Sequence, residues 1–354
     1  MSNLDDATVY RRLDPSAMRD RIRELPGECL KAWQQALAFE VLPGYAGADR
    51  IVVLGMGGSA IGGDLLSSLC ALEAKAPPVS VCRDYNLPLS VNEKTLVVAS
   101  SYSGMTEETL SAFNQAVATP AKKLVLTTGG ELKRLAERNG VPVFTISYAA
   151  QPRAALAHGF FPLLAVCQKL GLVSDKSADV AAMARVLEEL QPTIDEGCPL
   201  SRNPAKQLAT RLSGHVVVVY GAGFLSPVAE RWKTQINENG KAWAFYEVFS
   251  ELNHNAVVGY QFPADLAGRF FVVMLRSPLL HPRTLIRYKL TAEIVSQAKV
   301  SHETLDARGE NALAQMMSLV LFGDWVSYYL AILNETDPTP VKVIEGLKKH
   351  LQEA

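Results

Sequence analysis

Two loops that combine glycine with hydroxyl side chains carry the first chemical signal in this sequence. The first reads GMGGSAIGG from Gly55, and the second reads SYSGMTEE from Ser101. Each follows a short apolar run and opens a helix-compatible segment, so both are expected at the carboxyl edge of a parallel sheet, where ligands bind. Hydroxyls, exposed N–H groups and the positive end of a helix together favour a phosphate. The hydroxyls of Ser101, Ser103 and Thr106 therefore predict a phosphate site, and the alternative is that they simply cap the helix that begins near Glu107.

The first loop also admits another interpretation. Gly55, Gly57 and Ala60 fit the dinucleotide pattern G-x-G-x-x-G/A, and Asp84 lies near the place of the acidic residue that binds a ribose. The motif alone does not exclude a dinucleotide, although a dinucleotide fold gives no reason for the hydroxyls of the second loop. A Walker loop is excluded, because neither loop contains G-K-[ST].

A carboxylate and a histidine farther along the chain suggest proton transfer. Glu238 ends a predicted helix, because Asn239-Gly240 follows it as a stop signal. It faces the negative end of the helix dipole, a poor place for a structural glutamate and a suitable one for a group that accepts and returns a proton. His254 stands in a polar Asn-His-Asn setting. The alternatives are an exposed glutamate in a turn and a histidine with a surface or structural role.

A strand-then-helix rhythm positions these residues. A helical region is expected to open at Asp14-Pro15 and to continue towards Val41. Strands are expected at residues 51–54, 79–82, 95–99, 124–127, 141–146, 215–220 and 270–275. Further helices are expected at residues 60–72, 107–117, 132–137, 154–170, 178–194, 227–237, 284–297, 311–333 and 341–351. Short apolar strands that alternate with helices imply an α/β fold with mostly parallel sheets, covered on both faces.

The composition excludes several classes of partner. The chain has 354 residues, 48% of them hydrophobic, and a net charge of −1 without a basic block, so neither nucleic acid nor a membrane is an expected partner. The N-terminus lacks the apolar core of a signal peptide, and Gln315, Gly323 and Asp324 interrupt the longest apolar stretch, 312–333. Five scattered cysteines without C-x-x-C spacing predict a cytoplasmic protein without a disulfide framework, and no pattern of metal ligands is present.

Taken together, GMGGSAIGGD, SYSGMTEET, QINENGK and ELNHNAVVGY resemble the bifunctional phosphoglucose/phosphomannose isomerase family of the sugar isomerase (SIS) superfamily. The resemblance covers nearly the whole chain, including the DPTPV segment near its end. It implies two SIS-type α/β/α sandwich domains with mostly parallel sheets, plus N- and C-terminal helices. The expected division places residues 1–150 in the first domain and residues 151–354 in the second.

The resemblance also assigns roles to individual residues. Gly57, Gly58 and Ser59 match the family's first phosphate-side loop, and Ser101, Ser103 and Thr106 match the hydroxyls that hold the sugar phosphate. Arg153 matches an arginine near C1 and C2 of the substrate, and Glu238 matches the proton-transfer base. His254 matches the ring-opening histidine, which the family draws from the neighbouring subunit of a homodimer.

Two positions near the C-terminus are matched less directly. Lys348 is the best match to a lysine of the family's site, and Lys342 and Lys349 are the alternatives. Thr339 matches a threonine linked to acceptance of the mannose epimer.

The expected function is an aldose–ketose isomerase acting through a cis-enediol, without a metal or cofactor. Its substrates would be glucose 6-phosphate and, at the same site, mannose 6-phosphate, both giving fructose 6-phosphate. The main alternative is a non-catalytic SIS module that binds a sugar phosphate, which would not need Glu238, His254 and Arg153 together. An aminosugar-phosphate isomerase and a dinucleotide-dependent oxidoreductase are further alternatives.

Overall fold

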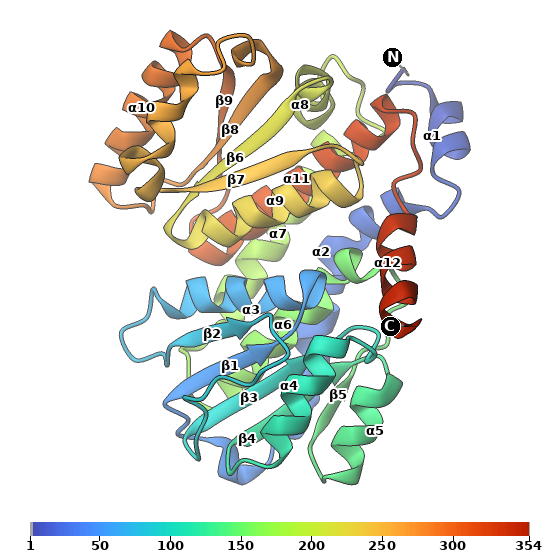
Figure 1. Ribbon diagram of the computed structural model, residues 1–354, viewed down its shortest axis with the longest axis vertical. Helices are drawn as coiled ribbons and strands as arrows, with labels where there is room; N and C mark the ends of the chain where they lie inside the picture. Colours follow the sequence, from blue (N-terminus) through green and yellow to red (C-terminus); the bar gives the residue numbers. More distant parts are fainter. Residues whose placement is uncertain (1–2, 354) are drawn as a thin grey trace.

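The protein, described by a computed structural model over residues 3–353 except the side chains of Pro43 and Gln352, contains two parallel sheets (Figure 1). The first has the order β2-β1-β3-β4-β5, with strands Val79–Cys82, Arg50–Leu54, Thr95–Ser100, Lys122–Thr127 and Val143–Thr145. The second has the order β7-β6-β8-β9, with strands Ala244–Phe249, Val216–Ala222, Phe270–Arg276 and Ser301–Asp306. Every strand pair is parallel, so the predicted α/β class is confirmed.

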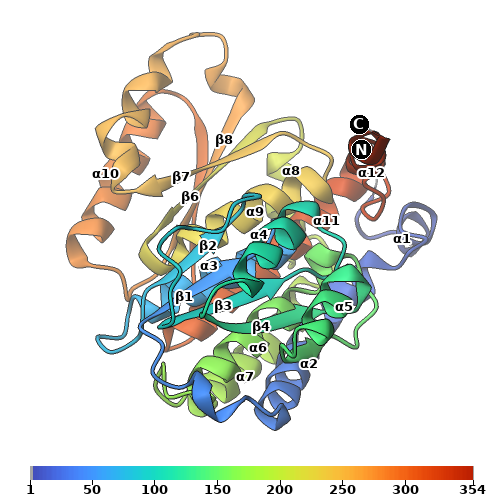
Figure 2. The same cartoon turned by 60° about the horizontal axis from the view of Figure 1, so that its bottom comes forward.

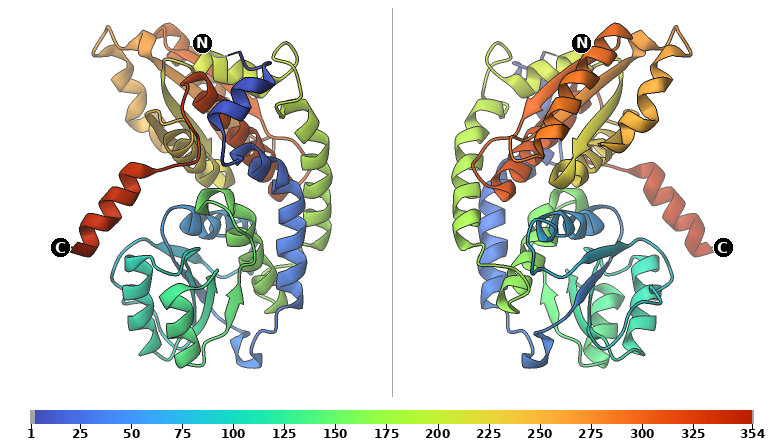
Figure 3. Two further views of the ribbon diagram at one scale, coloured as in Figure 1. Left: turned by 90° about the vertical axis from the view of Figure 1, so that its right-hand side faces the viewer. Right: turned by 90° about the vertical axis from the view of Figure 1, so that its left-hand side faces the viewer.

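Helices cover both sheets and join them. They are α1 to α12, at Ala7–Leu13, Met18–Ala38, Gly57–Cys70, Glu107–Val117, Gly130–Arg138, Leu156–Lys169, Ser177–Ile194, Pro204–Leu212, Ser226–Glu238, Pro282–Gln297, Ala312–Leu333 and Lys342–Glu353. Short 3-10 turns η1 to η6 lie at Pro43–Tyr45, Pro152–Ala154, Gly223–Leu225, Glu251–His254, Ala256–Gln261 and Ala267–Arg269. Figure 3 shows α2 and α7 running past both halves on one side, while α12 projects on the other.

The first sheet is buried on both faces, which explains its unbroken apolar strands. Along β1, Ile51 and Val53 belong to one buried cluster with α3 and α6, whereas Val52 and Leu54 belong to a second cluster with α4. Figure 2 shows α4 in front of this sheet. Because the strands are parallel, Leu54 pairs with Ala99, and the loops after β1 and β3 meet at one edge of the sheet.

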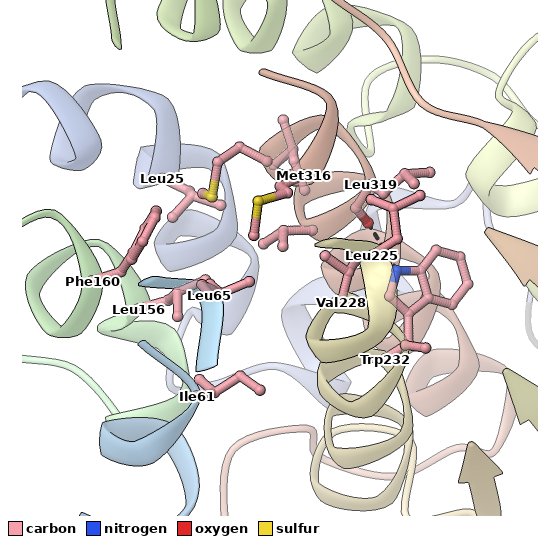
Figure 4. Close-up of a cluster of buried hydrophobic side chains, with 14 of the residues drawn as sticks. Leu25, Ile61, Leu65, Leu156, Phe160, Leu225, Val228, Trp232, Met316 and Leu319 are labelled. Carbon is pink, nitrogen blue, oxygen red and sulfur yellow. Dashed lines mark hydrogen bonds between the residues drawn. The ribbon is translucent and has the colours of Figure 1, made fainter. Parts of the chain in front are cut away.

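A shared core joins the two halves. In Figure 4, Leu65 and Phe160 of the first half face a cluster that includes Met316, Val228 and Trp232. The Trp232 Nε1 donates to the carbonyl of Leu319 at 2.8 Å, which fixes α9 to α11. The two halves therefore do not have separate interiors.

α11 is the central element of this shared core. It packs against α2, α7, α8 and α9. Among the described residues it is the one helix long and apolar enough to cross a membrane by length and composition, and 94% of its most apolar window is buried inside the protein.

Two features differ from the sequence prediction. The helix expected to open at Asp14-Pro15 begins at Met18, because Ala17 adopts a left-handed conformation (φ 56°) that turns the chain first. The Asp14 carboxylate still accepts from the N–H groups of Met18 and Arg19, at 2.8 and 3.0 Å. In addition, α1, α8, β7 and β9 were not predicted at all. The division after residue 150 stays a prediction, although α6 packs on α2 and α3, which favours a later boundary.

Candidate active site

The first glycine loop turns directly into α3. Gly57 begins the helix with φ +49°, and Gly58 lies against the backbone of the turn η2. A Cβ at Gly58 would stand 2.8 Å from the Pro152 carbonyl oxygen and 3.1 Å from the Arg153 nitrogen. Gly58 therefore allows two stretches of this chain to meet, which brings Arg153 to the start of α3.

The predicted hydroxyl residues meet at the edge of the first sheet. The Tyr102 N–H donates to the Ser59 Oγ at 3.1 Å, which joins the two loops. The buried Ser101 Oγ lies 2.8 Å from the Thr106 Oγ1 and accepts from the Gly104 N–H at 3.1 Å. Thr106 immediately precedes α4, so these hydroxyls surround a helix N-terminus, where an anion is stabilised.

Ser103 lies in the same loop and is exposed. Its Oγ accepts from the Met105 N–H at 3.2 Å, a local turn contact that leaves the hydroxyl proton free to donate. All six residues predicted for the phosphate site thus belong to two adjoining loops.

Arg153 is 3% exposed, and its guanidinium is held on three sides. The Nε donates to the Asn239 Oδ1 at 2.6 Å, and the Nη2 donates to the carbonyls of Pro338 and Thr339 at 2.7 and 2.8 Å. Burial lowers the pKa of Arg153, and the nearby Glu238 carboxylate opposes that shift. A guanidinium stays charged at physiological pH, so the site contains a fixed cation.

Glu238 is the last residue of α9, as predicted from Asn239-Gly240. Its Oε2 lies 3.5 Å from the Arg153 Nη1, and 27% of its side chain is exposed. Arg153 and Glu238 line a crevice between α3 and α9 together with the glycines of the first loop. The residues that line it are Gly57, Gly58, Ile61, Arg83, Arg153, Glu230, Arg231, Thr234, Gln235 and Glu238.

Five charged or polar residues of this crevice were not predicted, namely Arg83, Glu230, Arg231, Thr234 and Gln235. Arg83 follows β2 and bonds to Asp64, and it lies 3.5 Å from Glu230 across the crevice. Arg231 and Gln235 precede Glu238 on α9. Their spacing of four and three residues puts all three on one helix face, a signal that was present in the sequence.

An open groove of about 820 Å³ borders the other side of Glu238. Lys241 lies in it, and its Nζ donates to the carbonyls of Glu238 and Pro338. Burial lowers the pKa of Lys241, and the neighbouring Arg153 charge adds to the effect. Lys342 also lines this groove, whereas Lys348 and Lys349 are exposed on α12 outside it.

Two further predicted residues complete the description. The Thr339 carbonyl accepts from Arg153, while its Oγ1 is buried without a hydrogen-bond partner. His254 is exposed on η4, just after β7, and its ring makes no hydrogen bond with any residue of the described chain. It lines neither the crevice nor the groove that border Glu238.

Two parallel β-sheets covered by helices, with hydroxyl-rich loops at the edge of the first sheet, define a protein of the sugar isomerase (SIS) class. Residues 201–351 match the family model described as "Bacterial phospho-glucose isomerase C-terminal SIS domain". A solved structure of a glucose-6-phosphate isomerase like protein from Thermus thermophilus has the same fold, with a TM-score of 0.65 and 20% identity over 96% of this chain and 98% of that one.

More similar sequences identify the family. The chain is 43% identical to the bifunctional phosphoglucose/phosphomannose isomerase of Caldicellulosiruptor bescii, over 95% of this chain and 99% of that protein. It is 35% identical to the protein of the same name from Aquifex aeolicus, over 85% and 90%. The chain belongs to the bifunctional phosphoglucose/phosphomannose isomerase family.

Proposed function

We propose that this protein is an aldose–ketose isomerase that interconverts glucose 6-phosphate, mannose 6-phosphate and fructose 6-phosphate. The observation that carries the proposal is the opposition of the Glu238 carboxylate and the Arg153 guanidinium at 3.5 Å, in a crevice that begins at the first glycine loop. Membership of the family gives the substrate class. The experiment that tests it is an assay of the purified protein with each aldose.

Glu238 acts as the base in this proposal. In the open-chain aldose it takes the proton from C2, and the electron pair of the C2–H bond forms the C1=C2 double bond of a cis-enediolate with its charge on O1. Transfer of the hydroxyl proton from O2 to O1 gives the other ionised form of the cis-enediol, and return of the proton from Glu238 to C1 gives the ketose. One partly exposed carboxylate can remove and return the proton, because C1 and C2 are adjacent and both transfers take place on the same face of the enediol.

Arg153 stabilises the charge that develops on the enediol oxygens. Its guanidinium is buried and is held by Asn239, Pro338 and Thr339, so little reorganisation is needed when the charge appears. Fixed donors of this kind lower a barrier more than mobile ones do.

The two hydroxyl loops hold the phosphate, and this binding positions C1 and C2 against Glu238. Binding energy from a remote group is a general way to supply orientation at the reacting atoms. Glucose 6-phosphate and mannose 6-phosphate differ only at C2, and both give the same enediol. Rotation about C2–C3 after ring opening therefore lets one base serve both epimers.

Ring opening is assigned to His254 of a second copy of the chain. The exposure of His254, and its absence from the residues that line the crevice and the groove, support this assignment. Beside it, η5 packs against η4 and α10, and the exposed face of α10 carries Ile286, Leu290 and Ile294 at four-residue spacing. Val258 and Phe262 are also exposed there, at 70% and 80%. An apolar surface of this kind favours a homodimer contact next to His254.

The roles of the C-terminal residues are also proposals. Lys348 assists ring opening if α12 docks on a partner, and Lys342 is the alternative because it already shares a groove with Glu238. Thr339 serves the mannose epimer. The cytoplasm remains the predicted location.

The test uses glucose 6-phosphate and mannose 6-phosphate in parallel, coupled to detection of fructose 6-phosphate, with a chelator present. Turnover of both aldoses supports the proposal, and turnover of one limits it to that epimer. Binding of fructose 6-phosphate without any turnover at high protein concentration would favour the non-catalytic SIS module instead. Loss of activity in the chelator would overturn the metal-free mechanism.

A further inference from the structure

A buried carboxylate in the middle of α11 is not explained by the packing of that helix. Asp324 is 4% exposed, and its neighbours along the helix are almost all apolar. Its Oδ2 accepts from the Arg231 Nη2 at 2.7 Å, and its Oδ1 accepts from the Gln235 Nε2 at 2.9 Å. Burying such an ion pair is often no better for stability than packing apolar side chains of similar size, so its presence calls for another explanation.

Two paths of hydrogen bonds lead from Asp324 to Arg153. In the first, the Arg231 Nη2 that bonds to Asp324 also donates to the Arg153 carbonyl at 3.1 Å. In the second, the Ser327 Oγ donates to the Asp324 carbonyl at 2.8 Å and accepts from the Asn239 Nδ2 at 3.0 Å. The Asn239 Oδ1 in turn accepts from the Arg153 Nε at 2.6 Å. α11 therefore holds Arg153 by its backbone and by its side chain.

The same contacts fix the face of α9 that ends in Glu238. Arg231 and Gln235 are separated from Glu238 by seven and three residues, so all three project from one side of the helix. All three also line the crevice. By bonding to the first two, Asp324 sets the rotation of α9 and with it the direction in which Glu238 points.

Asp324 also balances the charge of Arg231. Arg153 pairs with Glu238 and Arg231 pairs with Asp324, while elsewhere in the crevice Arg83 pairs with Asp64 and lies 3.5 Å from Glu230. Lys241, just after α9, and Asp337, after α11, form a further pair of opposite charges near Arg153. On α2 the nearest titratable group is the thiol of Cys29, whose pKa burial raises, so it stays neutral.

Burial raises the pKa of Asp324, and the donors from Arg231 and Gln235 oppose that shift by favouring the carboxylate. Without this charge Arg231 would lose its carboxylate partner. Arg231 would then stabilise the ionised form of Glu238 as well, which weakens it as a base.

We propose that Asp324 is a positioning residue of this site: it orients Arg231 and Gln235 and balances the Arg231 charge, so that Arg153 and Glu238 act as the reacting pair. The inference rests on the proposed isomerase function. It adds the requirement that α11, a helix that does not line the crevice, supplies a carboxylate to the residues that do.

The test is the pH profile of kcat/KM for glucose 6-phosphate in the wild-type protein and in the D324N and R231Q variants. D324N keeps the shape of the side chain and removes the charge, so the acid limb is expected to move to lower pH by about 0.5 to 1 unit, with kcat reduced roughly tenfold. R231Q removes the opposite charge and is expected to move the limb to higher pH. The titration of the substrate phosphate is common to all variants and cancels in the comparison.

The matched control is D306N, because Asp306 forms a two-point pair with Arg276 on the surface, at 2.6 and 2.8 Å. It should leave the profile unchanged. A D324N variant whose kcat/KM falls by one factor at every pH, with an unmoved acid limb, would overturn the inference. If D324N does not fold, an R231Q limb that moves to lower pH overturns it equally, whereas a limb that stays in place agrees with the uptake of a proton by the buried Asp324 once its cation is removed.

A carboxyl ¹³C NMR spectrum of glutamate-labelled protein separates this inference from the proposed function. The Glu238 signal is assigned by its loss in E238Q, and its chemical shift should change in D324N even where no turnover is detected, because Asp324 no longer fixes the face of α9 that ends in Glu238. A wild-type protein without activity contradicts the isomerase proposal, whereas an unchanged Glu238 signal contradicts the role of Asp324.

Discussion

The Arg153 guanidinium and the Glu238 carboxylate face each other at 3.5 Å, although 85 residues separate them in the sequence. Arg153 comes from the turn η2, just after the first sheet ends, and Glu238 ends a helix of the second half. The pair thus exists only where the two halves meet, so changes on either side should disturb it.

Replacement of Glu238 by glutamine should reduce isomerisation by about three orders of magnitude or more, because the amide cannot take up the C2 proton. Binding of fructose 6-phosphate should stay within a few-fold of the wild-type value. Initial rates and isothermal titration calorimetry measure the two effects. E137Q is the matched control, since Glu137 is an exposed glutamate near the end of α5 and its change should leave the rates intact. Near-normal turnover in E238Q would remove Glu238 from the mechanism.

Arg153→Lys should lower kcat by about 100-fold and destabilise the protein by roughly 1 to 3 kcal/mol. A lysine keeps the charge but has a single nitrogen, so it cannot serve Asn239, Pro338 and Thr339 at once. Buried acceptors would then lack partners. Steady-state kinetics and urea unfolding measure the two effects, and the exposed Arg138→Lys exchange should change neither. Wild-type kcat in R153K would argue that charge alone suffices.

Mixing two inactive variants should restore activity if His254 crosses a subunit boundary. H254Q and E238Q chains, unfolded together and refolded, should form hybrid dimers in which one of the two sites has both groups. Random pairing gives about a quarter of the wild-type activity. Each variant refolded alone serves as the control and should remain inactive. A mixture no more active than its components would place His254 and Glu238 in the same chain or remove His254 from the reaction.

Two glycine-to-alanine changes should have opposite effects on stability. G58A pushes a Cβ to 2.8 Å from the Pro152 carbonyl and should cost about 1 to 3 kcal/mol, with lower activity because Arg153 moves. Gly27 lies within α2 with no atom within 4 Å of an added Cβ, so G27A should stabilise by about 0.5 to 1 kcal/mol. Urea denaturation of both variants measures the difference. Equal midpoints would show that the contact at Gly58 relaxes freely.

Much of the fold was accessible from sequence because the first sheet is buried on both faces. Its inner strands β1, β3 and β4 have apolar, buried centres, and the prediction for β2, 79–82, matches its bounds. β9 was missed because its sequence, SHETLD, is polar and lies at an edge of the second sheet. β7 is also an edge strand, and three of its residues are exposed. An edge strand needs no apolar run to form its hydrogen bonds.

The predicted site residues could be found as motifs, but their partners could not. Ser101 and Thr106 share one loop, and Glu238 precedes a recognisable stop signal. By contrast, the contact between Gly58 and Pro152 depends on how α3 and η2 pack, and nothing local to either segment indicates it. Asp324 was noted only as an interruption of an apolar stretch. Its pairing with Arg231 depends on the relative rotation of α9 and α11, which no sequence pattern specifies.

The late position of α11 in the sequence has a consequence for how the protein folds during its synthesis. A chain emerging from the ribosome completes both sheets before residue 312, yet the helix that packs against α2, α7, α8 and α9 follows afterwards. Until then, the nascent chain exposes the apolar surfaces that this helix later covers. Both halves should therefore gain their final stability together, late in synthesis, and a chain stopped before α11 should need a chaperone to stay in solution.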